Sequence, residues 1–260
     1  MNDVTWVQIR PFEQAFVRQL NDRANRVDDR RSYVTDFLTP REQVIAEHIA
    51  RANGLSSLSF GGYEQAERRR VLFYDGREED LPGMASYAVS CLMATSKRGS
   101  APLRHSDYLG SLLGLGIKRD KLGDLVLFDG GVYAFCTADM AGVLLQEWSE
   151  AGRTRLTVRL ITAIHEHDFT PPSIEKLTVT MQSLRLDALV AHAFSLSRTK
   201  VVEPIKAGLV QLNFTVCSDP AAAISPGDVL SFRGHGRARV VEIGGNSRSG
   251  RIFVTIGRYR

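Results

Sequence analysis

The sequence has no long hydrophobic run, so we expect no membrane-spanning helix. Its longest apolar stretches fall well short of the roughly 20 residues that cross a bilayer. The stretch from Met1 to Phe12 carries Asp3 and Arg10 and has no apolar core, so it does not resemble a secretory signal. We therefore expect a protein of the cytoplasm, or of the plastid stroma, without membrane insertion.

Cysteine is scarce, and this excludes two further classes. The three cysteines, Cys91, Cys136 and Cys217, are far apart, and their number and spacing match neither a disulfide framework nor a zinc knuckle. We expect three buried, reduced thiols. His165-Glu166-His167-Asp168 offers two histidines but no apparent third ligand, so we expect a surface strand end and no metal.

Positive charge is present in excess near the C-terminus. The segment from Met181 to Arg260 has 11 Lys and Arg against 5 Asp and Glu, a net charge of +6. The rest of the 260-residue chain has 22 against 24, a net of −2. A basic end on a nearly neutral body indicates a polyanionic partner.

Turn-forming residues divide the chain into three predicted domains. Leu81-Pro82-Gly83 marks one boundary, and Pro171-Pro172 is interpreted as a linker. The predicted domains are an N-terminal α/β domain over residues 1–82, a middle domain over 84–170 and a C-terminal domain over 181–260. In the first, Phe12, Phe16 and Leu20 predict a helix over 11–27, Pro40 begins a second helix, and strands are predicted over 58–63 and 71–74.

The middle domain is predicted to have the order β-α-β-β-α-β. Strands are expected over 87–95, 125–128, 132–136 and 155–161, with helices over 105–115 and 138–148. This order is typical of a ferredoxin-like fold, which RNA-recognition domains share. We see no aromatic platform of the kind that such domains use to stack bases.

The C-terminal domain is predicted to place two helices against a small sheet. The helices cover 185–194 and the stretch from Ser197 to Gly208, and strands are expected over 209–216, 228–233, 239–243 and 251–256. The fold class is therefore α+β and multidomain.

The helix that begins after Ser197 has cations where acidic residues are usual. A helix N-terminus has partial positive charge and free N–H groups, yet Arg198 and Lys200 lie there beside Thr199. Each cation costs about 0.3–1 kcal/mol when exposed, and a bound anion reverses that sign. With Arg185 at the preceding helix start, this indicates a phosphate site, provided that the protein's own carboxylates do not neutralise it. Solvated surface charges are the alternative.

Several motifs resemble the RNA-binding domain named after small-subunit ribosomal protein S-four. They are Ser183-Leu184-Arg185-Leu186-Asp187, Leu196-Ser197-Arg198-Thr199-Lys200, Ile205-Lys206-Ala207-Gly208, Val210, Asn213 and Pro226-Gly227-Asp228. The resemblance implies that the two helices and the following turn bind structured RNA. Pro204 departs from the family pattern, and because proline lacks an N–H we expect a kinked or tightened helix.

The middle of the chain resembles the YlmH family. The resemblance lies in the stretch from His105 to Asp124, with Gly61-Gly62-Tyr63 and Glu67-Arg68 upstream. It implies an N-terminal domain, an RNA-recognition-like domain and the S-four domain. It also implies ribosome-associated quality control, with binding to large ribosomal subunits that hold peptidyl-tRNA after stalling. A related cyanobacterial and plastid branch is labelled a photosystem II protein.

Two enzyme interpretations are weaker. Arg185-Leu186-Asp187 resembles the motif of pseudouridine synthases, but the 73 residues after Asp187 are predicted to form the binding module itself. Gly114-Leu115-Gly116 resembles a dinucleotide-binding loop but lacks its third glycine and ends a helix. We expect no enzyme and no cofactor. The alternatives are an RNA-modifying enzyme and a scaffold linked to photosystem II or cell division.

The predicted function is an RNA-binding accessory factor that contacts rRNA and tRNA on the large ribosomal subunit. The predicted RNA-binding residues are Arg185, Ser197, Arg198, Thr199, Lys200, Lys206, Arg233 and Arg237. A possible secondary RNA contact is formed by Lys118, Arg119 and Lys121.

Overall fold

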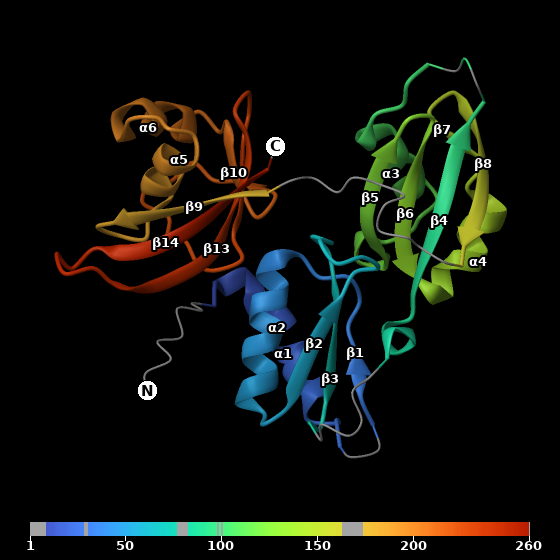
Figure 1. The fold of residues 1–260 in the computed structure, drawn as a ribbon, viewed down its shortest axis with the longest axis horizontal. Helices are drawn as coiled ribbons and strands as arrows, with labels where there is room; N and C mark the ends of the chain where they lie inside the picture. The colour runs from blue at the N-terminus through green and yellow to red at the C-terminus, as the bar shows by residue number, and fades with distance from the viewer. Residues whose placement is uncertain are drawn as a thin grey trace. The chain divides into compact units, whose positions relative to one another are not determined.

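The computed structural model describes residues 9–28, 31–76, 83–97, 99, 101–162 and 174–259. These residues, whose helices and strands are drawn in Figure 1, form two compact units. One contains residues 16–39 and 49–162, and the other contains 9–15, 40–48 and 174–259. Helices α1 (Gln14–Ala24) and α2 (Pro40–Ala52) have residues in both.

The first unit contains a small antiparallel sheet with the order β1-β3-β2. Its strands are β1 (Tyr33–Val34), β2 (Ser56–Phe60) and β3 (Arg70–Tyr74). The sequence predicted β2 and β3 but not β1, because two residues are too short to show a periodic pattern.

The apolar stripe predicted for the first helix is only partly correct. Leu20 is buried, but the Phe12 side chain is 73% exposed. The reason is local: Pro11–Glu13 forms a 3-10 helix, η1, before α1 begins. Its tighter winding breaks the α-helical spacing that would align Phe12 with Phe16 and Leu20.

The same unit contains a five-stranded antiparallel sheet with the order β5-β6-β4-β8-β7. Its elements are η3 (Met84–Tyr87), β4 (Val89–Ser96), α3 (His105–Gly114), η4 (Arg119–Lys121), β5 (Leu122–Phe128), β6 (Gly131–Thr137), α4 (Ala138–Glu147), β7 (Glu150–Ala151) and β8 (Thr154–Ile161). The predicted β-α-β-β-α-β order and ferredoxin-like arrangement are confirmed. Leu92, Leu112 and Leu144 join the sheet to its two helices in one core.

The opposite face of this sheet is covered by residues from the N-terminal part of the unit. Phe37, Tyr63 and Ala66 pack on Phe135 of β6 and form a second core with Cys91 and Val126. The rings of Tyr63 and Phe135 lie 5.2 Å apart. An aromatic residue therefore does lie on a central strand, but it is fully buried.

Asp124 on β5 links the N-terminal residues that cover this face to the sheet through hydrogen bonds. Its carboxylate accepts hydrogen bonds from the Tyr63 hydroxyl at 2.7 Å and from the backbone N–H groups of Glu67 and Arg68 at 2.7 and 3.1 Å. The buried Arg68 guanidinium in turn donates to the carbonyls of Leu122 and Phe37. Burial raises the pKa of the Asp124 carboxyl above its ordinary range, although the hydrogen bonds act in the opposite direction.

The second unit contains a six-stranded antiparallel sheet with the order β11-β10-β12-β13-β14-β9. Its elements are β9 (Ile174–Met181), α5 (Leu186–Ala193), α6 (Arg198–Lys206), β10 (Val210–Leu212), β11 (Thr215–Val216), β12 (Val229–Phe232), β13 (Gly236–Asn246) and β14 (Ile252–Tyr259). Figure 1 shows α5 and α6 on one face of the sheet, and Leu189, Val201 and Val240 belong to the shared core. Strand β9, which pairs with β14 over eight residues, was not predicted.

The strand predicted over 209–216 is instead a tight hairpin. Leu212 pairs with Thr215, which leaves Asn213 and Phe214 as a two-residue loop with φ values of 50° and 67°. Two positive φ values define a type I′ turn, which favours Asn-Gly. A left-handed conformation costs about 1–2 kcal/mol at a residue such as phenylalanine, so Phe214 is strained.

A buried carboxylate anchors this hairpin. Asp228 is 0% exposed and accepts hydrogen bonds from the Arg10 guanidinium, from the Asn213 amide at 2.8 Å and from the Ser225 backbone N–H at 2.8 Å. The Asn213 side chain also accepts a hydrogen bond from the Val229 N–H at 2.9 Å. Both the nitrogen and the oxygen of the Asn213 side-chain amide are therefore hydrogen-bonded, which holds the first residue of the loop in place.

We predict that Gly62→Ala destabilises the first unit by about 2–4 kcal/mol. Gly62 has φ 104°, and an added Cβ would overlap the ring of Phe135, so left-handed strain and overpacking act together. Urea unfolding followed by circular dichroism measures the change. Gly142→Ala is the matched control, because Gly142 lies in α4 with nothing within 4 Å of an added Cβ and should gain up to about 1 kcal/mol. Equal effects of the two substitutions would contradict the proposed overlap.

Candidate nucleic-acid interface

One carboxylate holds the starts of α5 and α6 together. Asp187, in the first turn of α5, is 4% exposed. Its Oδ2 accepts hydrogen bonds from the guanidiniums of Arg185 at 3.1 Å and Arg198 at 2.8 Å. Its Oδ1 accepts one from the Ala188 backbone N–H at 2.7 Å. Two arginines predicted to bind RNA are thus brought together from different helices.

The phosphate site was predicted on the condition that the protein's own carboxylates do not neutralise its cations. The structure meets this condition only in part. Asp187 pairs with both arginines, but one negative charge between two positive charges leaves a net positive charge. The side chains of Arg185 and Arg198 are 39% and 52% exposed. Ion pairs this exposed contribute only about 0–1 kcal/mol. Asp187 therefore orients the two guanidiniums without burying them.

The N-terminus of α6 lacks the expected side-chain cap. Ser197 occupies the N-cap position, but its hydroxyl makes no capping hydrogen bond and lies 3.0 Å from the Thr199 hydroxyl instead. Lys200 and both hydroxyl residues are exposed. The helix start thus presents two hydroxyls beside cations.

The remaining predicted cations of this unit differ in their surroundings. Lys206, the last residue of α6, lies 3.9 Å from Glu203, and both side chains are more than half exposed. Arg233 is exposed. The Arg237 guanidinium lies over the rings of Tyr259 and Phe214, at 4.7 and 5.9 Å from their centroids. Pro204 does not end α6, which continues to Lys206.

The three cations of the predicted secondary RNA contact have different surroundings: one is exposed, and two make hydrogen bonds or ion pairs within the protein. Lys118 is exposed. Arg119 donates hydrogen bonds to the carbonyls of Leu122 and Gly123, and burial lowers its pKa to about 10. Lys121 forms an ion pair with Asp36 at 2.7 Å. Two of the three side chains therefore also hold the first unit together.

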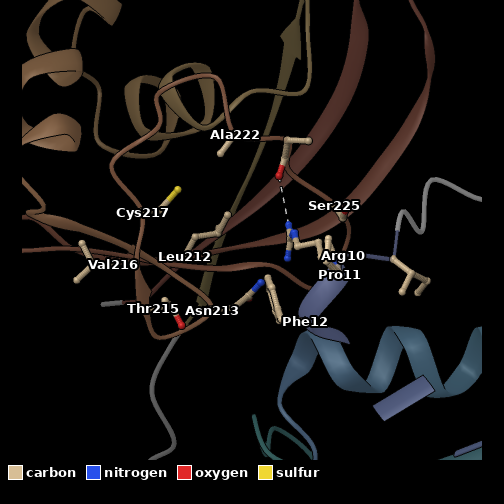
Figure 2. A pocket seen from close by; sticks show the side chains of 12 residues that line it. Arg10, Pro11, Phe12, Leu212, Asn213, Thr215, Val216, Cys217, Ala222 and Ser225 are labelled. Carbon is tan, nitrogen blue, oxygen red and sulfur yellow. Dashed lines mark hydrogen bonds between the residues drawn. The ribbon is translucent and has the colours of Figure 1, made fainter. Parts of the chain in front are cut away.

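A pocket of about 350 Å³ lies beside the β10–β11 hairpin (Figure 2). Its lining is mostly apolar, and the titratable residues among it are Arg10 and Cys217. Figure 2 shows the hydrogen bond that the Arg10 guanidinium donates to the backbone carbonyl of Ala223. The same guanidinium also pairs with the buried Asp228. A pocket with several converging titratable groups would favour the alternative of an RNA-modifying enzyme. Among the described residues that line this pocket, only Arg10 and Cys217 are titratable.

The expectation of three buried thiols is wrong for one of them. Cys91 and Cys136 are buried, and burial raises the pKa of each to about 12. Cys217 is only partly buried, because it lies at the pocket. Among the described residues, no group of three or more His, Cys, Asp or Glu could hold a metal, and no helix is long and apolar enough to span a membrane. His165-Glu166-His167-Asp168 and Pro171-Pro172 lie outside the described residues.

Three residues organise these units in ways that the sequence did not predict, although two of them lie in the motifs that carry the family resemblance. Asp124, Asp228 and Arg10 each make hydrogen bonds to residues far away in the chain. For Asp124 and Asp228 a weak signal exists, because both follow a glycine at the edge of an apolar run. For Arg10 we find no signal in the sequence.

The ferredoxin-like fold and the basic helix-on-sheet module, together with a matching family model described as an RNA-binding domain, define a multidomain protein of the RNA-binding class. Three family models match it in succession. They are "YlmH, N-terminal" over residues 13–76, "Putative RNA-binding domain in YlmH" over 82–165 and "S4 domain" over 184–230.

A curated relative extends this match to the whole chain. The ribosome-associated protein quality control protein P2 of Bacillus subtilis is 31% identical over 261 residues, covering 100% of both chains. The chain therefore belongs to the YlmH family. A solved structure, the cell division protein ylmH from Streptococcus pneumoniae, covers 60% of this chain and 94% of its own, with a TM-score of 0.51 and 19% identity, and shows a similar fold.

We predict that Asp187→Asn lowers stability near neutral pH and that the deficit shrinks in acid. Burial would raise the pKa of Asp187, but hydrogen bonds and charge from Arg185 and Arg198 outweigh it and hold the pKa below its ordinary value. A lowered folded-state pKa contributes stability above the ordinary value of about 4, and this is lost as pH falls through the folded-state pKa. Urea unfolding of both proteins from about pH 7 to about pH 3 tests this. A difference that stays constant over that range would contradict it.

Proposed function

We propose that this chain is a non-catalytic RNA-binding factor that associates with the large ribosomal subunit. It contacts rRNA and tRNA there and acts in the rescue or quality control of stalled translation in the cytoplasm. The observation that carries the proposal is the paired arginine site, in which one buried carboxylate orients Arg185 and Arg198 while both stay exposed.

The chemistry of that site suits a phosphate backbone. A guanidinium held in a fixed plane can donate two parallel hydrogen bonds to phosphate oxygens, and a helix N-terminus favours an anion. Ser197, Thr199 and Lys200 extend the donor surface along the first turn of α6, and Lys206 adds a cation at its end. Arg233 and Arg237 belong to the same unit, and we propose them as further contacts.

The ribosomal part of the proposal is supported by the curated relative. The name of that protein associates it with the ribosome and with protein quality control, and the two chains match along their full lengths. We propose that Lys118 adds a secondary RNA contact, with Arg119 and Lys121 acting chiefly through the fold of η4. The N-terminal and middle domains then position the basic module.

We predict that Arg198→Ala with Lys200→Ala flattens the salt dependence of RNA binding. If about five phosphates are contacted, log K falls with log salt at a slope of about −3.5 to −4.5, and each lost contact removes about 0.7–0.9. The double variant should therefore reduce the slope by about 1.4–1.8. Fluorescence anisotropy with a labelled rRNA stem-loop over a range of salt concentrations measures it.

The matched control is Arg18→Ala with Arg26→Ala. Both arginines are exposed and lie in the N-terminal segment, so the change in net charge is the same. The control should keep the slope of the parent protein. If the Arg198 and Lys200 variant also keeps it, the proposed phosphate contacts do not exist.

We predict that crosslinking in cells recovers large-subunit rRNA and tRNA, and that tRNA crosslinks increase when translation is stalled. The bound RNA is sequenced with and without an antibiotic that stalls elongation. A protein expressed with Arg198→Ala and Lys200→Ala is the negative control. Recovery of small-subunit rRNA or bulk mRNA alone would contradict the proposal.

A further inference from the structure

We infer that the tip of the β10–β11 hairpin is a stacking site for an unpaired RNA base, with Phe214 as its platform. The inference rests on the proposed RNA-binding function and adds a second kind of contact to it. The site at α5 and α6 offers charge to phosphates, whereas the hairpin tip offers the face of a ring to a base.

The first observation is the arrangement of flat groups around the hairpin tip. The Phe214 side chain is 50% exposed. The Arg237 guanidinium lies over its ring and over that of Tyr259, at 5.9 and 4.7 Å from the centroids. Aromatic rings and guanidinium planes are the surfaces on which proteins stack unpaired bases. Arg237 thus joins the hairpin to the end of β14 in one cluster of stackable groups.

The second observation is the strain at Phe214. A type I′ loop needs positive φ at both residues, and glycine is the residue that adopts it without cost at the second position. This chain has a phenylalanine there instead, with φ 67° and half of its side chain in water. Residues held in sparsely populated backbone conformations cluster at functional sites.

The third observation is that hydrogen bonds to a buried carboxylate hold the residue before Phe214. The Asn213 amide donates to the fully buried Asp228, and its carbonyl oxygen accepts from the Val229 backbone. Asp228 is also paired with Arg10. A loop whose first residue is held in this way loses less conformational freedom when a ligand binds, which reduces the entropic cost of binding.

The ligand class follows from these three features. The exposed ring lies beside a cation in a basic unit, which favours a flat, electron-rich group on a polyanion. Bases within a duplex are stacked on each other and offer no free face, so the site is expected to select loops, bulges or single strands.

The test uses the full-length protein with two probes of equal length, a stem-loop RNA with 2-aminopurine in its loop and a fully paired duplex. With the parent protein we expect 2-aminopurine fluorescence to be quenched by stacking. Phe214→Gly should weaken stem-loop binding by about 5- to 150-fold and abolish the quenching. Duplex binding and the salt slope should not change.

A loss of binding by Phe214→Gly cannot be attributed to unfolding if the variant keeps its stability, and glycine is expected to relieve the strain in the turn. Its Tm should be unchanged or raised by about 2–4 °C. Phe214→Tyr should bind the stem-loop like the parent protein. Val216→Ala is the matched control, since Val216 is 57% exposed on the same hairpin and offers no ring.

The inference is overturned if Phe214→Gly binds the stem-loop like the parent, if Phe214→Tyr loses affinity, or if Val216→Ala weakens binding equally. Failure of the proposed function looks different, because the variant with Arg198→Ala and Lys200→Ala would then keep the parent salt slope. The two readouts separate the loss of stacking from the absence of phosphate contacts.

Discussion

A carboxylate that is removed from water on folding needs hydrogen-bond donors from the protein. Three aspartates of this chain receive such hydrogen bonds at places where separate elements meet. Asp124 joins the Tyr63–Arg68 stretch to the sheet of the first unit. Asp187 joins the starts of α5 and α6, and Asp228 joins Arg10 to the β10–β11 hairpin. In each case the donors come from elements that the sequence separates, so the carboxylate specifies how those elements meet.

These junctions decide which surfaces are open to a nucleic acid. In an RNA-recognition domain the sheet face opposite the helices stacks bases. Here Phe37, Tyr63 and Ala66 cover that face, and Asp124 holds the cover in place. Base stacking is therefore not available at Phe135. Asp187 has the opposite effect, because it aligns two arginines that stay exposed.

Element order was predictable because it depends on local patterns. The continuous apolar runs in β4 and β6 are typical of strands buried on both faces, and the apolar spacing in α3 and α5 is typical of helices that bury one side. Strand β9 had such a pattern too, since Leu177, Val179 and Met181 alternate with polar residues, but it follows a predicted linker and was overlooked. The left-handed loop at Asn213 and Phe214 was not predictable, since phenylalanine is not a residue of type I′ turns. Nor does sequence reveal that the charges of Arg119 and Lys121 are used internally, because their partners are set by the tertiary fold.

The pairing of β9 with β14 has a consequence for how the second unit assembles. Thr178 and Thr255 face each other although 77 positions separate them, and the whole helical and hairpin region lies between. Closing so long a loop costs entropy before any ladder hydrogen bond forms, and high contact order slows folding. Helices α5 and α6 can meet through neighbouring residues early. On this argument the pairing of β9 with β14 is expected to form after the contacts between neighbouring residues in the basic module.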